Sequence, residues 1–326
     1  MTRYIIRRVL WFIPVVLAIT FATFALVRAI PGGPFDASGT RAVPDYIVGN
    51  LEEVYHLDEP LWQQFARYVW NVMHFDFGPS FTYQTQTVSD LIAQGMPISA
   101  QLGMMSLILG LLIGVPAGVI AALKHNTMAD YAATFIAVFG VSIPNIVLGP
   151  LLILVVGVWL NWLPVAEWGA VRPEDFWWQP WIPKPTLKFF QHAALPVLTL
   201  GSGISAGIAR LTRASLLQVI RADYIRTARA KGLRESVVVV RHALKNSFIP
   251  VVTVLGPMFA ALVTGTFVVE QIFAIPGMGK HFVASIGQRD YPLLTGATLV
   301  YAVFLVASNL FVDITYGFLD PRISYD

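Results

Sequence analysis

Residues Ser99–Leu123, SAQLGMMSLILGLLIGVPAGVIAAL, are 25 consecutive positions without a charged side chain. A helix of about 20 apolar residues is long enough to cross the hydrocarbon core of a bilayer, which is about 30 Å thick. Strands of a membrane barrel would instead appear as segments of about ten residues with alternating hydrophobicity. This stretch therefore predicts a transmembrane helix and places the chain among the all-α membrane proteins.

Other windows of the chain have the same apolar character, so we expect six membrane-spanning helices. The composition agrees, because 56% of the residues are hydrophobic and 13% are charged, whereas a soluble domain has about 25% charged residues. The chain has no cysteine, which excludes disulfides, Cys-ligated zinc and thiol chemistry. The six expected spans are 9–30, 99–123, 132–157, 193–216, 250–272 and 294–318.

The distribution of basic residues orients these spans. Residues 210–245 contain nine Lys or Arg and two acids, whereas residues 31–95 contain two basic residues and eight acids. Loops rich in Lys and Arg stay in the cytoplasm, so the basic loop and both termini are expected there. No cleavable signal peptide is expected, because the start with Arg3, Arg7 and Arg8 precedes about 20 apolar residues that can stay in the bilayer. We therefore predict a multi-pass protein of the cytoplasmic membrane.

This orientation divides the chain into three parts. Residues 1–30 would hold the N-terminus and the first span, and residues 31–95 an extracytoplasmic segment. Residues 96–326 would form a core of five spans with a cytoplasmic coupling loop at 217–249.

Three outer segments have distinct patterns. The apolar residues between positions 57 and 69 recur with the period of a helix, and Asp58-Glu59-Pro60 suits a helix start, so a helix is predicted there within the segment 31–95. Residues 158–192 are rich in tryptophan, as is typical near lipid headgroups, and residues 273–293 contain a run of turn-forming residues.

The cytoplasmic loop contains Arg221-Ala-Asp-Tyr-Ile-Arg-Thr-Ala-Arg-Ala-Lys-Gly232, which has the signals of a short capped helix. Asp223 is expected as the N-cap, where its carboxylate meets the positive end of the helix. Two cations lie in the last turn, and Gly232 can adopt the left-handed conformation that ends a helix. Topology alone would require neither caps nor the small residues Ala228 and Ala230. We therefore predict a rigid basic helix that a cytoplasmic partner binds.

Other motif-like strings have simpler interpretations. Gly203-Ile-Ser-Ala-Gly207 matches the G-x-S-x-G of serine hydrolases, but it lies within a span and no other span offers a histidine base. We interpret it, like the repeat of Gly110, Gly114 and Gly118, as small residues that let helices pack closely. The chain has no phosphate-binding loop, and its six histidines lack the spacing of metal ligands. The only acids within the expected spans are Glu270 and Asp313, both near an end, which argues against an ion-coupled transporter.

Several separate motifs together resemble one family. Arg226-Thr-Ala-Arg-Ala-Lys-Gly232, followed by His242-Ala-Leu-Lys-Asn246 and Pro250, is similar to the cytoplasmic loop of binding-protein-dependent ABC importers in its peptide-permease form. The general importer loop has Glu-Ala-Ala where this chain has Arg226-Thr227-Ala228. This departure is the one found in peptide permeases, so it indicates that subfamily. From end to end, the chain resembles the B-type membrane subunit of oligopeptide and dipeptide permeases. The other shared motifs are Arg7-Arg8, Pro31-Gly-Gly-Pro-Phe35, Tyr55-His-Leu-Asp58, Asp76-Phe-Gly-Pro-Ser80, Val269-Glu270, Pro276-Gly277, Arg289-Asp-Tyr291 and Asp320-Pro321-Arg322.

The resemblance implies the six-helix bundle of a type I ABC importer permease, working within a heteromeric complex in the lipid bilayer. The implied partners are a second homologous permease subunit, two ATP-binding subunits and an extracytoplasmic peptide-binding protein, with no nucleic acid. ATP and Mg²⁺ would bind to the ATP-binding subunits, so this chain would be a transport subunit without cofactor, metal or enzymatic activity. Ala228 and Ala230 would enter a groove of the ATP-binding subunit, and the cations would meet acidic groups at its rim. The implied coupling helix comprises Asp223, Tyr224, Arg226, Thr227, Ala228, Arg229, Ala230, Lys231 and Gly232.

Polar positions of the later spans are candidates to line the translocation pathway. A peptide needs water or hydrogen-bond partners to cross about 30 Å of hydrocarbon, although each of these residues could equally form an interhelical hydrogen bond. The outer loops are expected to dock the loaded binding protein, with acids at the rim, although exposed acids are more often simply solvated. The pathway candidates are Ser142, Asn145, Ser202, Ser205, Thr253, Thr264 and Thr266, and the docking candidates are Glu52, Glu53, Asp58 and Glu59.

Three alternative functions remain open at the level of sequence. The same machine could import a nickel chelate or an oligosaccharide, because selectivity in such systems lies largely in the binding protein. A stand-alone channel or secondary transporter should show buried ionisable residues along its pathway. An intramembrane hydrolase built on Ser205 would need a base on a facing helix.

Overall fold

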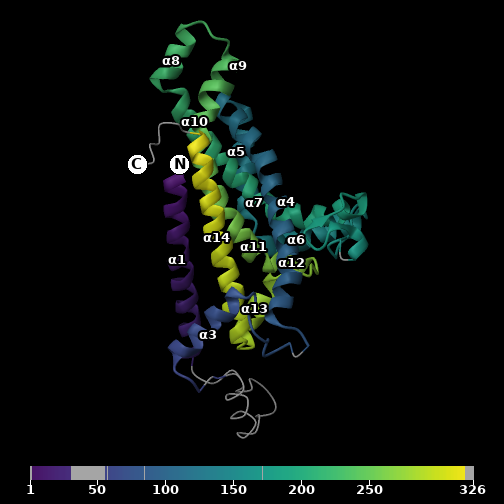
Figure 1. The fold of residues 1–326 in the computed structure, drawn as a ribbon. Helices are drawn as coiled ribbons and strands as arrows, with labels where there is room; N and C mark the ends of the chain where they lie inside the picture. Colours follow the sequence, from purple (N-terminus) through teal and green to yellow (C-terminus); the bar gives the residue numbers. More distant parts are fainter. Residues whose placement is uncertain (1, 31–55, 57, 84, 171, 320–326) are drawn as a thin grey trace.

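The computed structural model describes residues 2–30, 56, 58–83, 85–170 and 172–319 of the 326-residue chain. These residues form a bundle of long helices with one small antiparallel sheet of two strands (Figure 1). In chain order the elements are α1 (Thr2–Ala29), α3 (Leu61–Met73), α4 (Val88–Leu123), α5 (Met128–Ser142), α6 (Asn145–Leu152), the π-helix η1 (Ile153–Trp159), the 3₁₀ turn η2 (Pro173–Asp175), β1 (Phe176–Trp178), β2 (Ile182–Pro183), α7 (Leu187–Ile220), α8 (Asp223–Ala230), α9 (Glu235–Val237), the π-helix η3 (Val238–Leu244), α10 (Lys245–Ser247), α11 (Ile249–Gly265), α12 (Phe267–Ile272), α13 (Gly279–Gly287) and α14 (Tyr291–Leu319).

The centre of the bundle is the contact between α4 and α7. A Cβ added to Gly114 would lie 2.5 Å from the carbonyl oxygen of Ser205, and one added to Gly118 would lie 2.5 Å from that of Ala209. Only glycine fits so close to a neighbouring backbone, so the interpretation of the glycine repeat as a packing face is confirmed. α4 also starts earlier than the expected span 99–123, because a capping box between Thr87 and Asp90 begins the helix at Val88. The expected boundary between residues 95 and 96 therefore falls inside α4.

The expected span 132–157 is wrong as one continuous helix. α5 ends at Ser142, Ile143 is extended with φ −90° and ψ 115°, and α6 begins after Pro144. Proline has no N–H to donate within a helix and holds the preceding residue in an extended conformation. The chain continues to Trp159 through α6 and η1, so this apolar segment is helical but broken.

The expected span 250–272 is wrong at both ends. Its helical segment starts at Glu235 and bends by 46° where Glu235–Ser247 meets Ile249–Val263. At the other end, α11 stops at Gly265 and α12 starts after Thr266.

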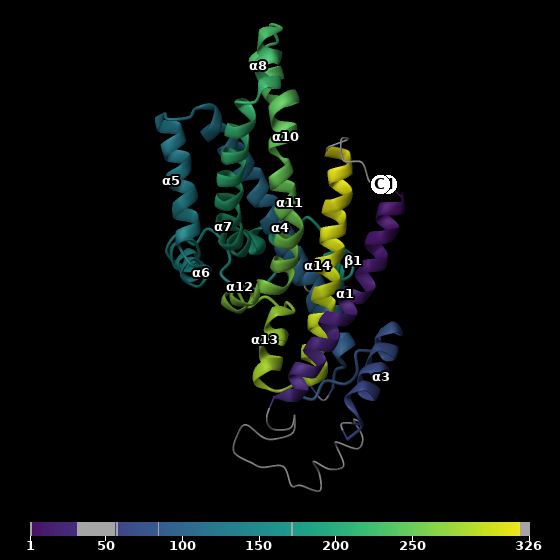
Figure 2. The same ribbon diagram turned by 90° about the vertical axis from the view of Figure 1, so that its left-hand side faces the viewer.

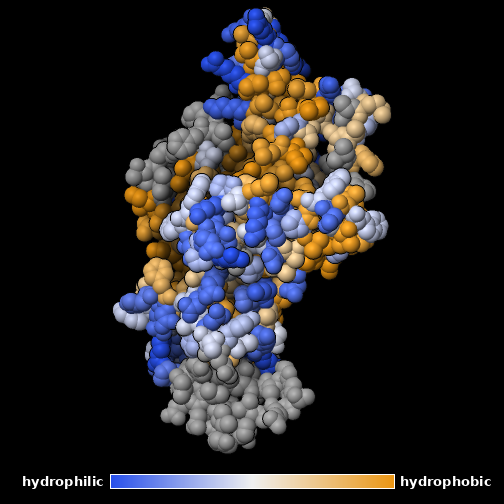
Figure 3. All heavy atoms as spheres, turned by 90° about the vertical axis from the view of Figure 1, so that its right-hand side faces the viewer, coloured by the Kyte–Doolittle hydropathy of each residue, from blue (hydrophilic) through white to orange (hydrophobic). Residues whose placement is uncertain are grey.

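Four helices of the described chain are long and apolar enough to cross a membrane, and the bent pair would be a fifth. Their outward side chains are apolar and exposed, as contact with lipid requires: Leu112 is 68% exposed and Phe311 is 72% exposed. Hydrophobic residues cover the part of the surface directly below the α8 end in Figure 3, and hydrophilic residues gather at that end. The four helices are Ile6–Ala29, Val88–Leu123, Leu187–Ile220 and Tyr291–Val312.

The two ends of the bundle carry different elements. α8 projects at one end, and the first turns of α1 and the last turn of α14 lie toward that same end (Figures 1 and 2). α3 and α13 lie at the opposite end. The predicted helix in the first outer segment is confirmed as α3, where Phe65 packs edge-on against the ring of Phe24, with ring centroids 5.5 Å apart.

The tryptophans of the segment 158–192 do not share one environment. Trp159, Trp162 and Trp177 are each 70% exposed, which suits the expected lipid interface. Trp168 is fully buried, and its Nε1 donates to Oε1 of Gln101 at 2.9 Å, so the interface prediction is wrong for this residue. A buried indole N–H needs a hydrogen-bond partner, and α4 supplies it.

Candidate functional site

The start of α8 differs from the expectation in one detail. The N-cap is Ala222, whose carbonyl accepts from the N–H of Ile225 at 3.1 Å, and Asp223 is the first helical residue. The Asp223 carboxylate instead lies 3.4 Å from Nη1 of Arg226. The prediction of Asp223 as N-cap is therefore wrong, although an acid in the first turn still lies at the positive end of the helix.

The end of α8 is as predicted. Gly232 has φ +71°, the left-handed conformation, and its N–H donates to the carbonyl of Arg229 at 2.9 Å. Residues with a Cβ are strained in this conformation, whereas glycine is not. No atom lies within 4 Å of the place where a Cβ on Gly232 would be, so backbone conformation alone requires the glycine.

One face of α8 is buried against the rest of the chain. Ile225 is fully buried and Ala228 is 7% exposed, three residues apart on one side of the helix. They pack against Leu216 at the end of α7 and Val238 in η3. The expectation that Ala228 faces outward into a partner's groove is therefore wrong, because α8 uses its small residue to approach its own hairpin.

Two polar contacts fix α8 to the segment that follows it. Nη2 and Nε of Arg229 donate to the two carboxylate oxygens of Glu235 at 2.6 and 3.1 Å. The Arg229 guanidinium holds the pKa of the Glu235 carboxyl below its ordinary value, and this carboxylate raises the pKa of Arg229. In addition, Nδ2 of Asn246 donates to the hydroxyl of Tyr224 at 2.8 Å. Arg229 is thus engaged within the chain, whereas it was expected to meet a partner's acidic rim.

The opposite face of α8 is free of the chain's own core. It is basic and polar with one small apolar residue. The helix itself projects from the end of the bundle (Figures 1 and 2). α8 joins α7 to the helices α9 to α11, so a force on this face acts on two long helices of the bundle. The exposed residues of this face are Asp223, Tyr224, Arg226, Thr227, Ala230 and Lys231.

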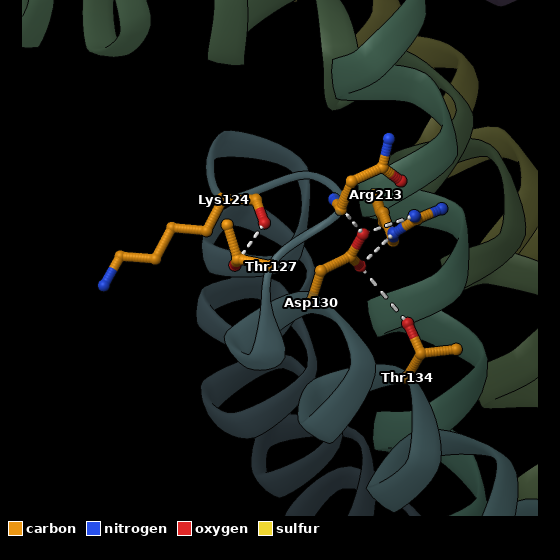
Figure 4. A network of polar contacts seen from close by, with 6 residues as sticks. Lys124, Thr127, Asp130, Thr134 and Arg213 are labelled. Atoms are coloured by element: carbon orange, nitrogen blue, oxygen red, sulfur yellow. Dashed lines mark hydrogen bonds and ion pairs between the residues drawn. The ribbon is translucent and has the colours of Figure 1, made fainter.

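An ion pair that the sequence analysis missed joins α5 to α7 below α8 (Figure 4). Nε and Nη2 of Arg213 donate to the two oxygens of Asp130 at 2.7 and 2.8 Å, and Asp130 is 2% exposed. The backbone N–H of Asn126 also donates to Asp130 at 3.0 Å, and the Thr134 hydroxyl lies 3.4 Å away. Arg213 had been counted only as a topological charge, and an acid just before an expected span was the signal that could have revealed its partner.

The candidate pathway residues lie in several environments. Ser202 and Ser205 are half-buried in α7, and their hydroxyls donate to carbonyls of their own helix at 3.0 and 2.8 Å. Ser205 also lines a hollow of about 340 Å³ between α4, α5 and α7. Thr253 is exposed on α11 and bonds the carbonyl of Ile249 at 2.9 Å. Ser142 is exposed and Asn145 is half-buried at the break between α5 and α6, and the side chain of Thr264 lies outside the described residues.

Thr266 does not line an open surface, so its assignment to the pathway is wrong in this conformation. Its side chain is fully buried, and its hydroxyl donates to Glu270. The Glu270 carboxylate also accepts from the Ser99 hydroxyl at 2.6 Å and from the N–H of Gly279 at 3.0 Å. Glu270 thus joins α12 to α4 and to the turn before α13, and hydrogen-bond donors surround its carboxylate.

The candidate docking acids are only partly within the described chain. Glu52 and Glu53 lie outside the described residues. Asp58 is exposed, and Glu59 pairs with Nη2 of Arg67 at 2.8 Å just before α3. Glu59 is therefore engaged in holding the start of that helix.

The alternative of a hydrolase site at Ser205 loses its support. Ser205 lies in the interior of a helix, whereas a nucleophile elbow requires a strand–turn–helix and a nearby base. Among the described residues, no group of three or more His, Cys, Asp or Glu could hold a metal ion. The strongest candidate for function is therefore the protruding α8 and the hairpin that carries it.

Comparison with solved structures shows which known fold the bundle shares. The fold is similar to a chain of the MetNI methionine ABC transporter in an inward-facing conformation, with a TM-score of 0.52 and 20% identity over 71% of this chain and 96% of that chain. A chain of an amino acid ABC transporter with histidines gives a TM-score of 0.50 at 14% identity, over 69% of this chain and 92% of that one. The bundle thus has a fold found in ABC transporters.

This chain belongs to the family of binding-protein-dependent transport system inner membrane components, whose family model matches residues 114–325. The model for the N-terminal region of such components matches residues 1–103. The chain is 45% identical over 323 residues to the dipeptide transport system permease protein DppB of Bacillus subtilis, covering 99% of this chain and 98% of that protein. It is 40% identical over 325 residues to the oligopeptide transport system permease protein OppB of Salmonella typhimurium, covering 100% of both. The resemblance indicated by the separate motifs is confirmed.

Proposed function

We propose that this chain is the permease subunit of an ATP-driven importer of dipeptides or oligopeptides. The support comes from the peptide permeases to which it is similar along its whole length, at 45% and 40% identity. The chain itself has an apolar helical bundle and a basic protrusion but no phosphate-binding loop. Energy would then come from two ATP-binding subunits, which would hold ATP and Mg²⁺, and not from this chain.

The proposed topology has six membrane crossings with both termini in the cytoplasm. The crossings would be α1, α4, the broken segment from α5 to η1, α7, α11 as the apolar part of the bent segment, and α14. An even number of crossings places both termini on one side, which agrees with the common end of α8, the start of α1 and the end of α14. The basic loop at that end favours the cytoplasm.

In this proposal α8 is the coupling helix, and one observation carries it: its buried face is fixed to its own hairpin while its outer face is free. When the ATP-binding subunits close on ATP, the groove that holds the outer face would move α8. Because Ile225, Ala228 and Arg229 tie α8 to α7 and α9, the movement would pass to both long helices. The bundle would then change between two packings, which opens the pathway to alternate sides.

The remaining partners follow from the same proposal. A second, homologous permease subunit would supply the other half of the pathway, along which we retain Ser142, Asn145, Ser202, Ser205, Thr253 and Thr264. A peptide-binding protein would dock on the outer segments, with Glu52, Glu53 and Asp58 as rim candidates. Single cysteines can test the pathway, because the chain has none of its own. Cysteines at these positions should react with hydrophilic thiol reagents during turnover, and uniform protection would overturn the assignment.

The alternatives differ in how they meet these observations. A stand-alone secondary transporter should have a buried ionisable group available for coupling, but buried Glu270 is held by three donors. Such an arrangement suits a structural role better than reversible ion binding. Import of a nickel chelate or an oligosaccharide by the same type of importer differs from our proposal only in the solute that is transported.

Reconstituted transport tests the proposal. The chain would be coexpressed with a second permease subunit, ATP-binding subunits and a peptide-binding protein from the same organism, purified with the subunits that accompany it, and placed in liposomes. We expect uptake of labelled dipeptide or oligopeptide that requires both ATP and the binding protein. Equal uptake by the chain alone would contradict the proposal, and ATP-dependent uptake of another solute but not of peptides would select the alternative cargo.

A further inference from the structure

A half-open cavity with a mixed polar and apolar lining lies where α1, α3 and α14 meet, at the end of the bundle away from α8. Its volume is about 120 Å³. A water molecule takes about 30 Å³ in the liquid, so the cavity has room for about four waters or for an anion with four oxygens. Within the part of the chain that the structure describes, its lining contains two arginines and a histidine but no aspartate or glutamate. The lining residues that matter most are Arg28, Gln64, Tyr68, Asn71 and Thr295.

Arg28 brings a cation to this cavity without an acidic partner among the described residues. Its Nε donates to Oε1 of Gln64 at 2.8 Å, and its Nη1 lies 3.4 Å from the carbonyl oxygen of Phe24. The guanidinium also lies over the Phe24 ring, 3.4 Å from the centroid. A guanidinium has five N–H donors, and these contacts use two of them. By contrast, the other arginine of the lining, Arg67, is already paired with Glu59 at 2.8 Å.

Two buried hydroxyls at the same cavity have no hydrogen-bond partner among the described residues. Thr295 Oγ1 and the Tyr68 hydroxyl are both buried and unpaired, and Thr295 is 2% exposed. Threonines in a helix commonly donate to the carbonyl four residues earlier, as Thr298 does to Leu294 on the same helix at 2.8 Å. Thr295 does not. Burial raises the pKa of the Tyr68 hydroxyl, so it remains a neutral donor.

We propose that this cavity binds a phosphate group, which Arg28, Tyr68 and Thr295 hold from three different helices. Each of these groups can donate a hydrogen bond, and an unpaired buried donor or cation is costly unless an acceptor meets it. Arginine matches the geometry of phosphate oxygens and binds two of them side by side. The bound group would fasten α1 and α3 to the start of α14.

The phosphate has two possible sources with the same chemistry: a phospholipid headgroup and free inorganic phosphate. Arg28 lies in the last turn of the apolar helix Ile6–Ala29, where a span reaches the headgroup layer. This position gives a headgroup direct access, whereas free phosphate would enter from the aqueous side.

The test uses the full-length chain purified with its accompanying subunits. One arm measures the thermal unfolding midpoint in detergent against inorganic phosphate, with chloride at equal ionic strength as reference. The other arm uses nanodiscs containing phosphatidylglycerol and counts by native mass spectrometry the phospholipids that stay bound. The variants are Arg28→Gln and Thr295→Val, with Arg172→Gln and Thr298→Val as matched controls away from the cavity. Tyr68→Phe keeps the ring and removes only the hydroxyl.

We expect a midpoint that rises with phosphate, or a phospholipid that stays bound, in the wild type and both controls. The affinity for phosphate or for the phospholipid should fall about tenfold or more in the cavity variants, because a hydrogen bond to a charged group is lost. The arm that responds identifies the source. Absence of any response in both arms would overturn the proposal. Thr295→Val and Tyr68→Phe variants that are as stable as wild type in saturating phosphate and that keep the bound phospholipid would overturn it too, because the two hydroxyls would then contribute nothing to holding the phosphate group.

Discussion

Gly232 and Ala228 act on α8 in different ways at the scale of single residues. Gly232 lets the chain turn at the end of the helix, with φ +71° and empty space around it. Ala228 lets the helix approach α7 and η3. Gly232 was singled out in the sequence as a left-handed helix end and Ala228 for its small size, but only the packing of α8 shows that Ala228 faces its own hairpin.

Replacing Gly232 with valine should uncouple transport and leave membrane insertion intact. A β-branched residue in the left-handed conformation costs roughly 1–2 kcal/mol, while the apolar spans and the number of basic residues stay unchanged. The measurement is peptide uptake and stimulation of ATP hydrolysis by loaded binding protein. Gly232→Asn is the matched control, because asparagine tolerates this conformation and should keep most activity. Equal uptake by the valine and asparagine variants would show that the left-handed turn is not needed.

Replacing Ala228 with leucine should loosen α8 from its own hairpin. Overpacking a buried site costs roughly 1–3 kcal/mol. We expect faster hydrogen exchange in residues 223–237 of the purified complex and reduced coupling. Ala230→Leu on the exposed face is the control for the packing effect, since it should leave this exchange unchanged while weakening binding of the ATP-binding subunit. Identical exchange in the two variants would contradict the assignment of the buried and exposed faces.

The sequence was sufficient for the residues whose role depends on local chemistry. Gly232 was predicted correctly because a left-handed end depends on the backbone of one residue. Ala228 and Thr266 were assigned wrongly, because the orientation of a side chain depends on which helices pack around it. The cap at Asp223 was placed one residue too late, since Ala222 is the N-cap. Asp130 was missed because its partner, Arg213, is 83 positions further along the chain.

At the scale of elements, two ion pairs set the stiffness of the region around α8. Arg229–Glu235 lies on the surface, with the two side chains 40% and 58% exposed. Asp130–Arg213 joins α5 to α7, and its carboxylate is almost fully buried. We therefore expect a small effect from the first pair and a larger one from the second.

The Arg229–Glu235 pair gives a defined pH dependence. The folded pKa of Glu235 is lowered, so the pair contributes fully above the unfolded pKa of about 4.3 and is lost as the pH falls through the lowered folded value. An exposed pair contributes roughly 0.2–1 kcal/mol. With a spin label at an Ala230→Cys position, Glu235→Gln should increase label mobility at pH 7. That difference should vanish in acid, and a difference that grew on acidification would have the wrong sign.

The Asp130–Arg213 pair should show a large coupling in a double-mutant cycle. The variants are Asp130→Asn, Arg213→Gln and the double variant, with the free energy of unfolding of the purified chain as the measurement. Side chains in direct contact couple by roughly 0.5–3 kcal/mol, so the costs of the two single variants should add up to more than the cost of the double variant. Arg210→Gln, an exposed arginine on the same helix, is the control. Additive costs would mean that the two residues act independently.

Elements were predictable where the apolar run is continuous and not where proline or packing intervenes. α1, α4, α7 and α14 follow from long apolar segments, although their ends extend beyond the expected limits. The break at Pro144 could be located from the sequence, but the direction of the chain after it depends on contacts with other helices. The bend before α11 has the same cause.

At the scale of the whole molecule, our proposal gives the two ends of the bundle separate functions. One end would couple to the ATP-binding subunits, and the other would dock the peptide-binding protein. One end carries the basic α8, and the other carries α3, α13 and the phosphate-sized cavity. The family could be recognised from sequence because its motifs occur along the entire chain. The cavity could not be predicted from the sequence, because α1, α3 and α14 contribute to it from positions far apart in the chain.

Cross-linking from α8 tests the central claim most directly. The chain has no cysteine, so an Ala230→Cys variant carries a single thiol on the exposed face of α8. In the purified complex, a short thiol-reactive photo-cross-linker at this position should join the chain to an ATP-binding subunit, with a yield that changes when ATP is added. The same probe at Ala228→Cys, on the buried face, and at Arg172→Cys, in the segment between η1 and β1, should give no such product. Cross-links to an ATP-binding subunit from Arg172→Cys but not from Ala230→Cys would contradict the account.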